Sequence, residues 1–127
     1  GLATAVDIVC KHKERADALV LVELKTGYRG DRSAPVRNVA GMPIKMQAPL
    51  ATARDCALHR HLAQLAATYA LFKQEKGTLK ALQSVGATKV SAALLYVSES
   101  RGPECFWLPD WWERRGSKLL DAAARRS

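Results

Sequence analysis

Residues 6–28 have the sequence VDIVCKHKERADALVLVELKTGY, in which the polar segment KERAD separates two apolar runs. Residues 4–12 alternate between the two sides of an extended chain, which is typical of a β-strand. Residues 18–26 form a nearly continuous run rich in Val and Leu, which predicts a strand covered on both faces. The stretch therefore predicts two antiparallel strands joined by a tight connection at residues 13–17.

Each predicted strand carries one carboxylate, Asp7 in the first and Glu23 in the second. The position midway between them is Arg15, at the centre of the polar segment, so a symmetric hairpin places the two acids directly opposite each other. Opposed residues in a strand pair have Cβ atoms about 4.5–5.5 Å apart, and like charges at that distance repel. Because side chains alternate between faces, Lys25 lies on the same face as Glu23.

Two carboxylates that face each other on a covered strand need either a shared proton or a cation between them. Magnesium is the natural candidate, because it accepts one or two carboxylates together with waters and phosphate oxygens. Lys25 can then orient or deprotonate a water molecule, or neutralise charge on a phosphate. The alternative is a salt bridge between Lys25 and Glu23 or Asp7. The matched acid, the apolar strand and the basic excess favour the metal site.

Further strands and a long loop are predicted around this hairpin. Residues 27–54 contain three Gly, three Pro and one acid, and predict a long basic loop or insertion. Residues 89–98 predict a strand, and residues 105–109 predict a strand that returns beside it.

Two helices complete the prediction. Residues 55–76 carry one apolar stripe and start where Asp55 can cap the helix, and residues 78–87 suggest an extension. A second helix starts at Asp110 and is broken or weakened at Gly116. The stripe consists of Leu58, Leu62, Leu65, Tyr69 and Phe72. We therefore expect an α/β domain, with a central mixed sheet that contains an antiparallel hairpin and is flanked by helices.

The composition favours a polyanionic partner, because 20 Lys and Arg stand against 12 Asp and Glu and give a net charge of +8. A soluble protein with a solvated basic surface is the alternative. Three cysteines without a CxxC pair indicate a reducing, intracellular compartment, the nucleus and organelles included. No apolar run approaches the roughly 20 residues of a membrane span, so no membrane partner is expected.

The pattern AVDIV…VLVELKTGY resembles the PD-(D/E)xK nuclease superfamily in its RecB-like branch. That branch carries an Asp at the end of one core strand and Glu-x-Lys on the next, often followed by Thr and Gly. A helix with a Gln-Leu…Tyr pattern comes later, and HLAQLAATYALF at residues 61–72 is similar to it. The matching residues are Asp7, Glu23, Lys25, Thr26, Gly27, Gln64, Leu65 and Tyr69.

The resemblance implies a single nuclease-like domain over residues 1–127, with a restriction-endonuclease-like core that lacks its N-terminal helix. It implies a metal-dependent nuclease, such as an exonuclease, that hydrolyses phosphodiester bonds in DNA with single strands or free ends. Asp7 and Glu23 would bind Mg²⁺ or Mn²⁺, with the Leu24 carbonyl as a further ligand.

The resemblance also implies that Lys25 would assist the attacking water, while Gln64 and Tyr69 would sit beside the site and position the DNA strand. The family usually has a further acid on a helix before the first core strand, and no acid precedes Asp7 here. The chain begins almost inside that strand, so we expect a fragment whose missing segment or partner chain carries the acid. The alternative is a catalytically inactive, nuclease-derived domain that binds nucleic acid or assembles with a subunit.

The basic loop is expected to contact phosphates, with a solvated loop as the alternative. Its candidate nucleic-acid residues are Tyr28, Arg29, Arg32, Arg37 and Lys45. Helical periodicity places Tyr69 in the core, and only the resemblance gives it a nucleic-acid role. His61 can approach the active face. Three tryptophans near the C-terminus favour a core anchor with a partner interface over a stacking platform for single-stranded nucleic acid.

Overall fold

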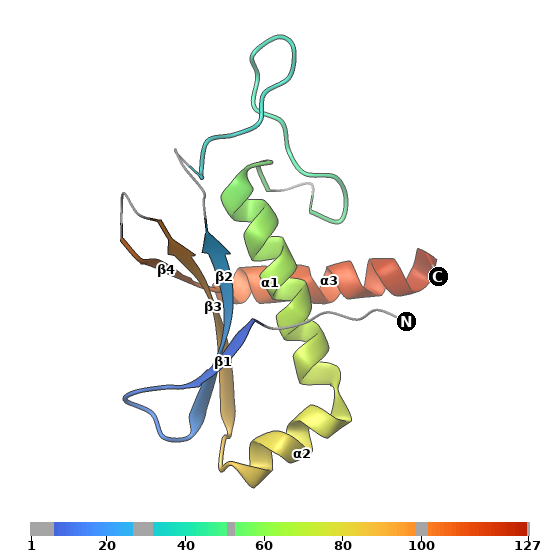
Figure 1. Cartoon of the computed structure of the whole chain (residues 1–127). Coiled ribbons are helices and arrows are strands. Elements are labelled where there is room, and N and C mark those ends of the chain that lie inside the picture. The colour runs from blue at the N-terminus through green and yellow to red at the C-terminus, as the bar shows by residue number, and fades with distance from the viewer. Residues whose placement is uncertain (1–6, 27–31, 51–52, 99–101, 127) are drawn as a thin grey trace.

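The computed structural model describes residues 7–26, 32–50, 53–98 and 102–126. Over these residues, four strands form one sheet and three helices pack beside it (Figure 1). The elements are β1 Ile8–Lys11, β2 Ala18–Thr26, α1 Ala57–Gln74, α2 Lys76–Ser84, β3 Lys89–Val97, β4 Glu104–Trp107 and α3 Asp110–Arg126. None of these helices is long and apolar enough to cross a membrane.

The sheet is mixed, as predicted, with the strand order β1-β2-β3-β4. The outer pairs β1–β2 and β3–β4 are antiparallel, and the central pair β2–β3 is parallel. A parallel pair needs a long crossover connection, which the loop after β2, α1 and α2 provide. The α/β class and the return of the last strand beside β3 are therefore confirmed.

The hairpin has the predicted register. The paired residues of β1 and β2 are all centred on position 15, with Ile8 opposite Val22 at the outer end. The next position outward places Asp7, which directly precedes β1, opposite Glu23. Residues 4–6 of the predicted first strand lie outside the described residues.

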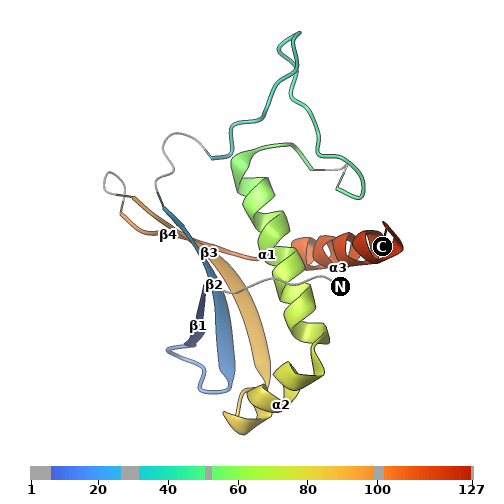
Figure 2. The ribbon, with the colours of Figure 1, turned by 45° about the vertical axis from the view of Figure 1, so that its right-hand side comes forward.

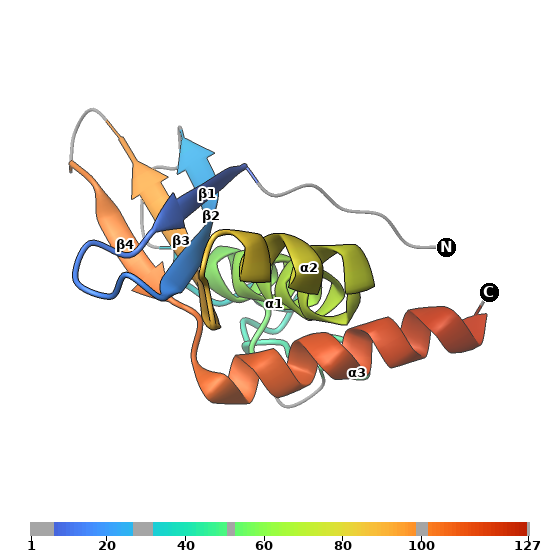
Figure 3. The ribbon, with the colours of Figure 1, turned by 90° about the horizontal axis from the view of Figure 1, so that it is seen from below.

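The core lies between the sheet and the helices. All three helices lie on the same side of the sheet (Figure 2), and the view in Figure 3 shows the strands on one side and the helices on the other. The apolar stripe predicted for α1 is buried or packs against the core along its whole length. The sheet contributes Leu21, Leu94 and Tyr96 to this core, and α3 contributes Trp112.

The helix ends differ in part from the prediction. Cys56 caps α1, and its Sγ accepts a backbone N–H at 3.4 Å. The expected cap, Asp55, instead binds the guanidinium of Arg60 at 2.6 Å. The suggested extension is a separate helix, α2, and the turn after it contains Gly86 with a φ of 73°.

No helix within the described ranges covers the second face of the sheet, which we call the open face. Ala18 and Val20 are nevertheless only 5% and 6% exposed on it, so the expectation that β2 is covered on both faces holds for the first half of the strand and not for the second. Every helix within the described ranges lies on the other side (Figure 2). Alternation along the strands directs Val22, Leu24 and Trp107 toward the open face. Leu24 and Trp107 are 37% and 52% exposed. The apolar character of β2 therefore does not require a second covering layer.

The predicted loop has no helix or strand in its described parts, residues 32–50 and 53–54. Two isolated β-bridges nevertheless hold its backbone together. Leu50 and Ala53 reach the core, and Met46 packs against it, while residues 36–45 project beyond the N-terminal end of α1 (Figure 1).

Helix α3 continues through Gly116, which corrects the expected weak point. The glycine lies directly against α1, where a methyl group would overlap the backbone carbonyl of Ala66 and approach its Cβ to 3.0 Å. The absence of a side chain therefore allows the two helices to come close together.

Gly116→Ala is expected to lower the free energy of unfolding by about 1–3 kcal/mol, because the added methyl group overpacks this contact. Gly77→Ala is the matched control, since Gly77 in α2 meets nothing closer than a Glu75 side-chain oxygen at 3.9 Å. There, alanine should stabilise the helix by about 0.5–1 kcal/mol. Urea unfolding followed by circular dichroism measures both changes. Equal effects of the two substitutions would contradict the close approach of α1 and α3.

Candidate active site

Asp7, Glu23 and Lys25 lie together near the C-terminal end of β2, on the face of the sheet that α1 covers. Asp7 stands just before β1, and its Oδ2 accepts a hydrogen bond of 2.9 Å from the Leu24 backbone N–H. This bond fixes the Asp7 carboxylate across the strand pair from Glu23. The two predicted acids are therefore neighbours on one side of the sheet.

Lys25 is the centre of the polar contacts in this site. Its Nζ donates to Gln64 Oε1 at 3.0 Å and lies 3.6 Å from Glu23 Oε1. Gln64 comes from α1, whereas Lys25 and Glu23 are same-face neighbours on β2. The structure thus brings together the four residues predicted for the chemistry. It also contains the salt bridge that the sequence left as an alternative.

Glu23 is a buried acid whose charge is only partly compensated. Burial raises the pKa of Glu23 above its ordinary value of 4.5, and the charge of Asp7 raises it further. Lys25 lowers that pKa through its charge and a hydrogen bond, but does not cancel the rise. Because the residue is only 7% exposed, water does little to stabilise the carboxylate. An additional cation beside Glu23 and Asp7 would do so.

The donor set suits one hard divalent cation. Two carboxylates and a backbone carbonyl are the oxygen ligands that Mg²⁺ and Mn²⁺ prefer. The N–H and C=O of a residue in an extended strand point to the same edge, so the Leu24 carbonyl faces the side on which its N–H binds Asp7. Within the described ranges, no group of three or more His, Cys, Asp or Glu side chains could hold a metal ion. Waters and substrate oxygens would therefore complete the coordination.

A second polar cluster lies beside Lys25. His61 of α1 has its Nδ1 2.7 Å from the hydroxyl oxygen of Tyr96 in β3. Burial lowers the pKa of this imidazole, and the positive charges of Lys25, Arg32 and Arg60 lower it further. His61 is therefore neutral at neutral pH and adds no positive charge to the site.

Arg32 connects the start of the loop to the sheet. Its terminal nitrogens donate to the two carboxylate oxygens of Glu104 at 3.1 and 3.3 Å. Its guanidinium carbon lies 4.1 Å from the centre of the Tyr96 ring, and the residue is buried. This placement differs from the predicted phosphate contact, because the guanidinium is already paired inside the protein.

The other predicted loop residues have mixed outcomes. Tyr28 and Arg29 lie outside the described residues. Arg37 and Lys45 are exposed on the projecting loop, as a phosphate contact requires. The Nη1 of Arg37 donates to the Gly41 carbonyl at 2.8 Å, which holds the turn of the loop.

Tyr69 lies in the core, where helical periodicity places it, and not beside the carboxylates. Its hydroxyl donates to the Val90 carbonyl at 2.7 Å. Val90 pairs with Leu19, which is four residues before Glu23 and therefore about 13 Å along β2. Burial and the nearby charge of Glu113 raise the pKa of Tyr69 to about 12.

Sequence reasoning missed Tyr96 and Glu104, which hold His61 and Arg32 beside the site. A tyrosine hydroxyl in an apolar strand needs a polar partner, so Tyr96 could have been noticed. Nothing local could have joined Arg32 to Glu104, because 72 positions separate them.

Comparison of the chain with protein-family models, with curated proteins and with solved structures finds no match. The function is therefore inferred from the geometry of this site together with the resemblance in its sequence.

Glu23→Gln is expected to raise the free energy of unfolding at neutral pH. The raised pKa means that the native state binds the Glu23 proton more tightly than the unfolded chain does. The wild type therefore loses stability as the pH rises from the ordinary value of 4.5 through the native pKa, and the deficit remains above it. Thermal unfolding across this pH range should show an advantage of the variant that vanishes at acidic pH.

Glu14→Gln is the control for this measurement, because Glu14 is exposed in the hairpin connection. Its effect on the melting temperature at neutral pH should be smaller than that of Glu23→Gln. If Glu23→Gln and Glu14→Gln behave alike, the carboxylate of Glu23 is not destabilised by burial and by the charge of Asp7.

Proposed function

We propose that the chain is a metal-dependent nuclease domain that hydrolyses phosphodiester bonds in DNA. One observation carries the proposal: Asp7 stands opposite Glu23, and the Nζ of Lys25 lies beside them at 3.0 Å from Gln64. A salt bridge needs one acid and one base, whereas this site has a surplus carboxylate and a positioned amine. The second carboxylate favours a cation-binding site over a purely structural salt bridge.

Asp7 and Glu23, with the Leu24 carbonyl, would hold Mg²⁺ or Mn²⁺. When bound, such an ion lowers the pKa of a coordinated water and neutralises charge on the phosphate. The fit rests on the two acids: Lys25 lies 3.6 Å from Glu23, and within the described residues Asp7 forms no ion pair and accepts a hydrogen bond from a backbone N–H.

The remaining residues define how the amine acts. Gln64 Oε1 accepts a hydrogen bond of 3.0 Å from Lys25 Nζ and so holds the ammonium group beside Glu23. The ammonium group can hold a water for attack or stabilise negative charge that develops on the phosphate. His61 stays neutral, so among the described residues the cation paired with Glu23 is Lys25, at 3.6 Å.

A nucleic-acid substrate is supported by charge. The net charge of +8 favours a polyanion, and Arg37 and Lys45 are exposed on the loop that projects from the same end of α1 as the site (Figure 1). DNA with single strands or free ends is the substrate class that the sequence resemblance implies.

A binding module without activity is the second candidate. It is favoured by the small number of ligands, because the described residues bring only two carboxylates to the site. Such a module would bind nucleic acid or a subunit in a salt-dependent way without cutting.

Mg²⁺ or Mn²⁺ is expected to raise the melting temperature of the wild type, because a ligand that binds only the native state stabilises it. At a concentration 100-fold above the dissociation constant, the gain is about 2.7 kcal/mol. Asp7→Asn should abolish the shift. Asp121→Asn, at an exposed position of α3, should retain it. A shift of equal size in both variants would show that the ion binds elsewhere.

Cleavage of labelled linear DNA is expected with Mg²⁺ or Mn²⁺ and not with chelator. Lys25→Ala should reduce the rate by about 10²–10⁴-fold, the range for loss of a group that assists proton transfer. Lys118→Ala, on the exposed side of α3, removes the same charge and should cut at the wild-type rate. Salt-sensitive DNA binding without cleavage would support the binding module instead.

A further inference from the structure

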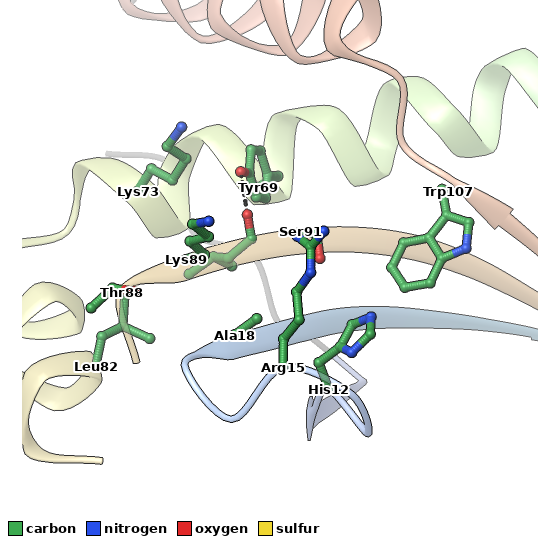
Figure 4. Close-up of a pocket in the computed structure, with 11 residues that line it drawn as sticks. His12, Arg15, Ala18, Tyr69, Lys73, Leu82, Thr88, Lys89, Ser91 and Trp107 are labelled. Carbon is green, nitrogen blue, oxygen red and sulfur yellow. Dashed lines mark hydrogen bonds between the residues drawn. The ribbon is translucent and has the colours of Figure 1, made fainter. Parts of the chain in front are cut away.

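A cavity of about 620 Å³ opens near the end of the sheet opposite the carboxylate pair (Figure 4). It lies beside the N-terminal ends of β2 and β3. Three of its lining residues are cations, Arg15, Lys73 and Lys89, and His12 lies beside them with its Nδ1 accepting the Glu14 backbone N–H at 3.1 Å. They come from the hairpin connection, α1 and β3, so the fold gathers positive charge that no single run of sequence contains.

The charge of these three cations is only partly offset by nearby acids. Among the described residues, no Asp or Glu lines the cavity, and none of the three cations forms an ion pair. Asp17 lies next to the cavity and accepts a hydrogen bond from the Thr88 hydroxyl at 3.0 Å, and the charge of Glu113 reaches the lining residue Tyr69. Lys73 lies 5.1 Å from the centre of the Tyr69 ring, a contact that leaves its charge uncancelled. The cavity therefore attracts anions.

An exposed tryptophan joins this cavity to the open face of the sheet. Trp107 lines the basic cavity and also a second cavity of about 390 Å³. The floor of the second cavity consists of apolar strand residues, and its rim includes Lys11, Lys13 and one acid, Glu14. His12 lines both cavities, and its ring centre lies 6.3 Å from that of Trp107. Flat aromatic surface and cations thus occur side by side.

We propose that these adjoining cavities bind a segment of single-stranded nucleic acid, with a base stacked on Trp107 and neighbouring phosphates bound by Arg15 and Lys89. Bases of any identity stack on an exposed aromatic ring, and cations beside it follow the backbone. A duplex hides the faces of its bases, so stacking on Trp107 requires an unpaired strand. An acidic peptide would satisfy the cations but has no base to place on the indole.

The binding site is separate from the carboxylate pair. Trp107 points to the open face, whereas Asp7 and Glu23 face α1. Ala18, which lines the basic cavity, is five residues and about 17 Å from Glu23 along β2. The choice of nucleic acid as the ligand rests on the proposed function. The site then anchors the strand at a distance from the phosphodiester bond that is cut.

The test measures binding without cleavage. Fluorescence anisotropy of a labelled 15-nucleotide single strand of mixed sequence, in chelator, gives the dissociation constant. Trp107→Leu should weaken binding about tenfold, because it removes stacking while it keeps an apolar side chain. Trp107→Phe should restore most of the affinity. Arg15→Glu should weaken binding more strongly and reduce its dependence on salt.

Each variant has a matched control. Lys118→Glu makes the same change of two charge units as Arg15→Glu, but at an exposed position of α3 away from both cavities. Trp111→Ala removes another exposed tryptophan, which is 45% exposed on α3. Both controls should bind nearly as tightly as the wild type. Circular dichroism and thermal unfolding verify that every variant is folded before binding is compared.

Four results would overturn the proposal: equal loss in Arg15→Glu and Lys118→Glu, no loss in Trp107→Leu, duplex bound as tightly as the single strand, or efficient competition by polyglutamate. Loss of binding in Trp107→Leu by a protein that never cuts DNA would leave this site standing and reject the nuclease. If Trp107→Leu and Arg15→Glu bind the single strand normally and the protein cuts DNA, this binding site is rejected and the nuclease stands.

Discussion

The antiparallel pairing of β1 with β2 is the constraint on which the candidate site depends. Its register, centred on position 15, places Asp7 opposite Glu23 on the face toward α1. A slip of one residue would turn every side chain of one strand to the other face and separate the two acids. The hydrogen bond from the Leu24 N–H to Asp7 adds a side-chain contact to this register just beyond the last paired residue of β1.

Local pattern was sufficient for much of the fold. The length of the polar connection fixed the hairpin register, and the apolar stripe fixed the side of α1 that faces the sheet. The positions of Glu23 and Lys25 on one face followed from alternation along a strand, and the placement of Gln64 beside Lys25 was expected only from the resemblance. These features depend on spacing over a few residues, where the geometry of strands and helices leaves few choices.

Other features depend on contacts between distant segments. The pairing of Arg32 with Glu104 and the contact of His61 with Tyr96 arise only when the loop, α1 and the sheet come together. Gly116 suggested a weak helix, because its contact with α1 cannot be read from α3. The apolar run of β2 suggested two covered faces, but apolar residues also form the open face, where Trp107 is exposed.

The hydroxyl of Tyr69 covers part of the edge of β3 that β4 leaves unpaired. Among the described residues, β4 pairs with β3 at Ala93–Tyr96, the Leu108 N–H donates to the Ala92 carbonyl, and the Tyr69 hydroxyl binds the Val90 carbonyl beyond that stretch. An edge strand with unpaired N–H and C=O groups is a template to which another polypeptide can pair, and such pairing leads to aggregation. With a pKa of about 12, the phenol stays protonated and keeps donating under physiological conditions. It occupies the Val90 carbonyl, an acceptor that a strand added beside this part of β3 would need.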